Sequence, residues 1–133
     1  SRKSFPYRRV LLALTELPFA ASAAQLAIDV ARMFDAEFHL AVVHQPDIVE
    51  GPEQREEMER RRREVERLAG MYHVRPHTTV LEGNPIRELT KLTSDFDLLV
   101  IPHARGRTGS LTRPDVGLNL IHRAACSVMI MPH

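Results

Sequence analysis

Short apolar runs alternate with helix-like segments along almost the whole chain. Continuous runs rich in Val, Ile and Leu are typical of strands buried on both faces, whereas apolar residues at helical spacing indicate packed helices. The strands predicted in this way are residues 9–14, 37–44, 75–81, 98–101 and 128–131. The predicted helices are residues 18–34, 52–70 and 85–94, with a fourth between the last two strands.

This alternation constrains the architecture strongly. Strands separated by helices pair in parallel through right-handed crossovers, and 133 residues are too few for an eight-stranded barrel. The expected fold is therefore an α/β, three-layer α/β/α sandwich around a five-stranded parallel, Rossmann-like sheet. We expect one domain over residues 1–133, with residues 1–6 as a flexible N-terminal extension.

Composition excludes several classes of partner. The net charge of +1 gives no overall attraction for nucleic acid or an anionic membrane, and no apolar run approaches the length of a membrane span. We therefore expect a cytoplasmic protein that binds neither. The single cysteine, Cys126, cannot form an intrachain disulfide, and its apolar neighbours predict a buried, inert thiol.

Residues 52–70 carry six arginines and six glutamates. Because the two charges interleave at helix-pairing distances, a solvated helix face is favoured over an RNA-binding surface. The predicted pairs are Glu56 with Arg60, Glu57 with Arg61 and Glu59 with Arg63. His73 and His77 have the spacing of helical metal ligands, but Pro76 separates them. We expect no metal site.

The sequence offers no constellation of catalytic residues. No serine lies in a GxSxG elbow, no Lys-Ser or Lys-Thr follows a glycine loop, and no GxGxxG follows the first strand. The chain is thus expected not to be an enzyme. Ligands of open α/β sheets bind beyond the carboxyl ends of the strands, which directs attention to the segments after Leu14 and residue 101, with His44 and His103 near the opening.

The segment "RGRTGS" follows the fourth predicted strand and has two possible roles. Its glycines, Gly106 and Gly109, lie three apart beside Arg105, and this composition can wrap an anion with backbone N–H groups and a guanidinium charge. A simple surface loop has the same composition. The residues alone leave both interpretations open.

Five segments together resemble the universal stress protein family, in its order and at its spacings: "YRRVLLAL", "AEFHLAVVHQP", "LEGNPIRELTKLTSDFDLLVIP", "ARGRTGS" and "LIHRAACSVMIMP". The resemblance implies strand order 3-2-1-4-5, frequent homodimers and a cytoplasmic role in stress response or signalling. One branch of the family binds ATP and another does not.

The chain departs from the ATP-binding branch at the phosphate positions. The Asp after the first strand is Thr15 here, the opening glycine is Pro102, and the phosphate-binding Gly-Ser pair falls on Pro114 and Asp115. An alternative alignment with the family's glycine motif keeps Gly106, Gly109 and Gly117. It shortens the spacing between the last two glycines and places no hydroxyl residue after the last one. Proline removes an N–H donor and a carboxylate repels a triphosphate, so the nucleotide pocket is expected to be degenerate.

The adenine side is better retained. Val43 corresponds to the residue whose backbone meets adenine in ATP-binding relatives, and Gly83 lies in the bordering "GNP" turn. The candidate ligand-binding residues are Leu14, Thr15, Val43, Gly83, Pro102, His103, Arg105, Gly106, Gly109 and Asp115.

We expect a non-enzymatic stress-response module that acts by dimerisation and by binding an unknown protein partner, with no required cofactor. The alternatives are an ATP- or AMP-binding sensor that uses Arg105, Gly106 and Gly109 for phosphates, and a weak nucleotide hydrolase. The last strand, expected at a sheet edge with unpaired backbone groups, predicts a homodimer. Its residues are Val128, Met129, Ile130 and Met131.

Overall fold

The structure is a computed structural model that describes residues 7–14, 21–44, 51–102 and 123–131. Five strands form one sheet of order β3-β2-β1-β4-β5, and every pair of neighbouring strands is parallel. The strands are β1 Arg9–Leu14, β2 Glu37–His44, β3 Pro76–Glu82, β4 Leu98–Pro102 and β5 Ser127–Met131. The predicted fold class and the strand order implied by the family resemblance are both confirmed.

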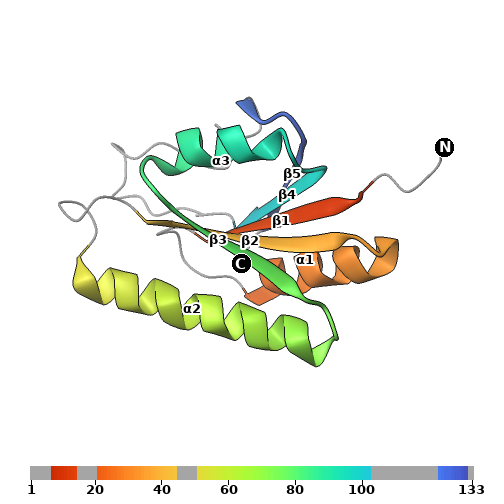
Figure 1. Ribbon diagram of the computed structural model, residues 1–133, viewed down its shortest axis with the longest axis horizontal. Coiled ribbons are helices and arrows are strands. Elements are labelled where there is room, and N and C mark those ends of the chain that lie inside the picture. Colours follow the sequence, from red (N-terminus) through yellow and green to blue (C-terminus); the bar gives the residue numbers. More distant parts are fainter. Residues whose placement is uncertain (1–6, 15–20, 45–50, 103–122, 132–133) are drawn as a thin grey trace.

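Three described helices cover the sheet (Figure 1): α1 Ala21–Phe34, α2 Pro52–Met71 and α3 Pro85–Thr93. α1 and α2 lie on one face, and α3 lies on the other. The fourth predicted helix falls largely on residues outside the described ranges, as do residues 18–20 of the first. None of the described helices combines the length and apolar character needed to cross a membrane.

Two apolar cores separate the layers because successive strand side chains point to opposite faces. Val10, Leu12 and Phe38 pack against α1 and α2, whereas Leu11 and Leu99 pack beneath α3. All five are almost completely buried. The central strands are therefore apolar on both sides, which explains why their sequences are continuous apolar runs rather than alternating ones.

Local signals set the helix ends. α2 begins after Gly51, whose N–H donates to Gln54 Oε1 at 3.2 Å, and Pro52 occupies the first turn, where its missing N–H costs nothing. α3 is capped by Asn84, whose Oδ1 accepts a hydrogen bond from the Arg87 N–H at 3.1 Å. At every described end, the observed bound lies within one residue of the predicted one. Ser94, the last residue predicted for α3, is its C-cap.

Candidate functional site

The described pairings of β2 reach different points on its two sides. On the β1 side they are described to Leu14, the last described residue of β1, opposite Val42, and on the β3 side they continue to His44 opposite Glu82. Val43 is fully buried and His44 is 7% exposed. The last two residues of β2, named here the ledge, are thus held in place by β3.

The direction of the backbone groups on this ledge follows from one hydrogen bond. The Gly83 N–H donates to the His44 carbonyl at 2.9 Å, so that carbonyl is directed toward β3. Successive carbonyls of a strand point to opposite edges, and the carbonyl of Val43 therefore faces the β1 side, just past Leu14. An acceptor at this position suits a ligand that presents an amino group in the plane of the sheet.

Gly83 makes the sharp exit from β3 into α3. Its φ of +142° lies in a region that residues with a side chain rarely adopt. A Cβ built on it would also lie 3.3 Å from Glu88 Oε2. The backbone conformation therefore favours glycine, an added Cβ would in addition require the Glu88 side chain to shift, and the turn holds the Gly83 N–H on the His44 carbonyl.

The described candidate residues lie together at this end of the sheet. Leu14 and Pro102 are the last residues of the neighbouring strands β1 and β4, and the register of these strands places them level with each other. Val43 and Gly83 form the ledge and its supporting turn. Thr15, His103, Arg105, Gly106, Gly109 and Asp115 lie outside the described residues, and their roles stay predictions.

Two contributors to the site were not among the candidate ligand-binding residues, although His44 was expected near the opening. The His44 carbonyl anchors the Gly83 turn, and Asn84 fixes the start of α3 directly after it. The Asn-Pro pair is a recognisable helix start in the sequence, so Asn84 could have been found. The anchoring carbonyl has no sequence signal, because any residue carries one.

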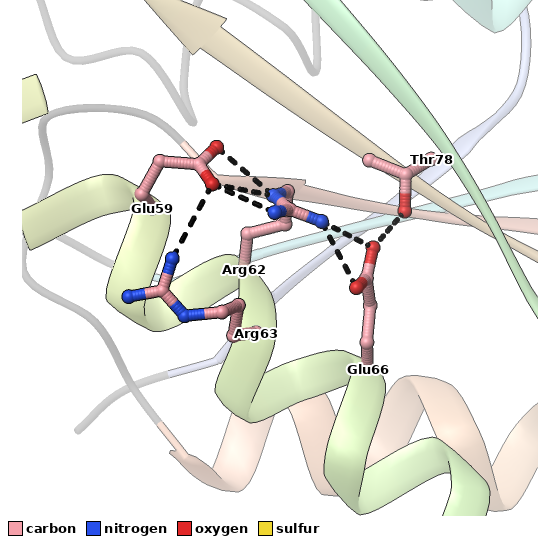
Figure 2. A network of polar contacts seen from close by, with 5 residues as sticks. All are labelled: Glu59, Arg62, Arg63, Glu66 and Thr78. Atoms are coloured by element: carbon pink, nitrogen blue, oxygen red, sulfur yellow. Dashed lines mark hydrogen bonds and ion pairs between the residues drawn. The ribbon is translucent and has the colours of Figure 1, made fainter. Parts of the chain in front are cut away.

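Figure 2 shows the charge network that α2 presents toward β3. Arg62 donates to Glu59 at 2.7 Å and to Glu66 at 3.0 Å, and Thr78 Oγ1 of β3 donates to Glu66 at 2.5 Å. The hydrogen bond from Arg62 holds the pKa of the Glu59 carboxyl below its ordinary value, and the charges of Arg62, Arg63 and His44 add to the effect.

The charges of α2 are largely satisfied within the helix. The predicted pairs Glu57–Arg61 and Glu59–Arg63 are present at 3.1 and 3.6 Å. The third predicted pair is wrong, because Arg60 contacts Glu57 rather than Glu56. These pairs support the interpretation of α2 as a solvated, self-paired helix.

Cys126 lies half-buried just before β5. Burial raises the pKa of its thiol to about 11, and the negative charge of Asp97 acts in the same direction. The thiolate is therefore scarce near neutral pH, which agrees with the predicted inert thiol.

The family model of the universal stress proteins matches residues 6–132, almost the whole chain. The chain belongs to the universal stress protein family. No curated protein matches it significantly, so the family assignment depends on the pattern of the whole domain rather than on a close relative.

Solved structures of universal stress proteins share the fold. The UspA protein of Lactobacillus plantarum is 15% identical, with 94% of this chain and 97% of that chain covered and a TM-score of 0.72. A universal stress protein in complex with cAMP is 19% identical, with coverages of 95% and 97% and a TM-score of 0.73. The protein from Archaeoglobus fulgidus in complex with dAMP is 16% identical, with coverages of 95% and 98% and a TM-score of 0.67.

Proposed function

We propose that this universal stress protein domain is a non-enzymatic stress-response module that binds an adenine nucleoside monophosphate at the carboxyl end of its sheet. The observation that carries the proposal is the ledge of Val43 and His44. The Val43 carbonyl is an acceptor for the exocyclic amine of adenine. Because the contact uses the backbone, it tolerates the side-chain changes that separate this chain from its relatives.

The preference for a monophosphate follows from the phosphate positions. Thr15, Pro102 and Asp115 replace residues that serve ATP in the ATP-binding branch. Pro102 has no N–H to donate, and the Asp115 carboxylate disfavours a nearby triphosphate. Two structural neighbours were solved in complex with cAMP and with dAMP, and these complexes support a pocket for an adenine nucleoside monophosphate in the family.

The module acts through association rather than chemistry. β5 is an edge strand of the sheet, and Val128 and Ile130 pack on the core beneath α3. Its backbone edge, together with the partly exposed Met129, favours pairing with a second copy. We propose a homodimer through β5 that presents its remaining surface to a protein partner, without hydrolysis of the nucleotide.

Calorimetric titration of the purified chain with AMP and with ATP plus magnesium tests the proposal. We expect AMP to bind with a Kd below about 1 mM, equivalent to about −4 kcal/mol, and ATP to bind no more tightly. Tenfold tighter binding of ATP, or no binding of either nucleotide, would contradict it. Release of phosphate from ATP that disappears in an Arg105→Ala variant would contradict the non-enzymatic part.

A pair of glycine variants locates the binding. Gly83→Ala strains the turn below the ledge and brings the new methyl against Glu88, so we expect AMP affinity to fall at least fivefold. Gly70→Ala is the matched control, since a Cβ there meets nothing within 4 Å and the residue lies in α2. Thermal unfolding of both variants separates a loss of binding from a loss of fold.

A further inference from the structure

A second concave surface lies at the opposite end of the sheet, where β2 and β3 begin. A pocket of about 500 Å³ opens between the last turns of α1 and α2 and the starts of these two strands. In Figure 1 both helix ends lie on the right of the molecule. Its polar lining, named here the amino-end surface, consists of Arg32, Asp35, Glu37, Tyr72, His73, Arg75 and His77.

Two of these residues adopt left-handed backbone conformations. Asp35 has a φ of +53° and directly follows α1, and His73 has a φ of +62° and lies two residues after the last residue of α2. Glycine is the usual residue at such a position, and a side chain there costs about 1 kcal/mol. Both turns of the same pocket therefore keep a polar side chain at a position where glycine would be more stable.

The amino-end surface carries the guanidinium groups of Arg32 and Arg75 and the carboxylates of Asp35 and Glu37. The Arg32 guanidinium lies over the Tyr72 ring, 4.9 Å from its centroid, which fixes its position. Within the described part of the chain, neither Arg32 nor Arg75 belongs to an ion pair. Glu37 contacts Arg9 at 3.2 Å and His39 at 3.0 Å, so Asp35 is the remaining carboxylate among the lining residues.

Two exposed methionines are sequence neighbours of lining residues. Met33 follows Arg32 in the chain and is 73% exposed, and Met71 precedes Tyr72 and is 61% exposed. They are the two most exposed large apolar residues of the described ranges. Methionine, tyrosine and arginine are the residue types enriched at protein interfaces, and methionine adapts to varied partners.

We propose that the amino-end surface docks a segment of a partner protein that carries acidic side chains next to apolar ones. The acidic groups pair with Arg32 and Arg75, and the apolar groups cover Met33 and Met71. Small-molecule pockets are mostly apolar and enclosed, whereas this one is lined by charged side chains from two stretches of the chain, residues 32–37 and 72–77. Since it lies at the end of the sheet opposite Val43, partner and nucleotide can be bound together, and docking does not depend on the proposed nucleotide site.

Selection of random displayed peptides against the full-length chain provides the probe. We expect enriched peptides to combine Asp or Glu with apolar residues and to shift the amide NMR signals of Arg32, Tyr72 and Arg75. Arg32→Ala and Arg75→Ala should each weaken peptide binding at least tenfold, as truncation of an interface anchor does. Arg63→Ala is the matched control, because Arg63 is an exposed arginine of α2 distant from the pocket lining, and it should leave affinity unchanged.

Three results would overturn the proposal. They are the absence of any enriched peptide, peptides whose binding is unaffected by loss of Arg32 and Arg75, and peptides that shift signals at β5 or at the ledge instead. Inorganic phosphate is titrated separately, and shifts of the same amides at millimolar phosphate without peptide binding would reassign the surface to a small anion. If Arg32→Ala and Arg75→Ala keep the wild-type melting temperature, a loss of peptide affinity is due to the lost arginine contact and not to unfolding.

Discussion

Thr93 joins α3 to the segment that leads into β5, and its removal gives the sharpest stability prediction. The side chain is fully buried, and its hydroxyl donates to the Thr90 carbonyl at 2.7 Å and accepts from the Ala125 N–H at 3.0 Å. Thr93→Val keeps the shape of the side chain and removes both hydrogen bonds. No cavity opens, so the change isolates the polar contribution.

The expected loss of stability follows from the polar groups that Thr93→Val leaves without a hydrogen-bond partner. The Ala125 N–H loses its partner in a part-buried position, which costs about 1–2 kcal/mol, and the bond to Thr90 contributes about 1 kcal/mol. Allowing for the more favourable burial of a methyl group, we expect a net loss of about 2 kcal/mol. For a domain of this size the melting temperature should fall by about 6–8 °C.

Thr90→Val is the matched control, three residues earlier on the same helix. The Thr90 hydroxyl is buried and has no hydrogen-bond partner among the described residues, so replacing it should be neutral or stabilising by up to about 1 kcal/mol. Urea unfolding followed by circular dichroism gives both free energies. A loss below about 0.5 kcal/mol for Thr93→Val, or an equal loss for both variants, would refute the reasoning.

Three further predictions concern charge, thiol reactivity and assembly. The pKa of Glu59 is lowered in the folded state, chiefly by Arg62, so the stabilisation from this ion pair is present above about pH 4.5 and is lost as the pH falls through the pKa of the folded state. Arg62→Gln should therefore destabilise the protein more at pH 7 than at pH 3 in urea titrations. An equal effect at both pH values would exclude this linkage. Because burial raises the pKa of Cys126 to about 11, iodoacetamide at pH 8 should modify the native thiol at least tenfold more slowly than the urea-unfolded one; equal rates would show an accessible thiolate. In sedimentation at tens of micromolar, we expect a dimer that Met129→Lys on β5 dissociates, whereas Val80→Lys on the opposite edge strand β3 does not; a wild-type monomer would rule this interface out.

The fold could be predicted because its signals are local and repeated. The buried strands β1 and β2 are continuous apolar runs, and both were predicted with their observed bounds. Helix ends were less precise: the sequence pattern of α2 ends at Gly70, but the helix continues to Met71 and ends before the left-handed His73. A one-residue extension changes little energetically, so the sequence specifies it weakly.

The two binding surfaces differ in how far they could be predicted. The resemblance to the family led to Val43 and Gly83, but the reason for their roles, a ledge held in place by β3, depends on the pairing register. The amino-end surface was missed entirely. Asp35 and His73 look like ordinary polar turn residues in the sequence. Only the structure shows that both adopt left-handed conformations, in which glycine is the usual residue.

The most direct test of the account is the amide NMR spectrum of the full chain during titration with AMP. The account predicts that the signals of Val43, His44 and Gly83 shift together and saturate with the calorimetric affinity, while those of β5 and the amino-end surface stay in place. Saturable AMP binding that leaves these three amides unshifted would contradict an adenine site on the β2 ledge.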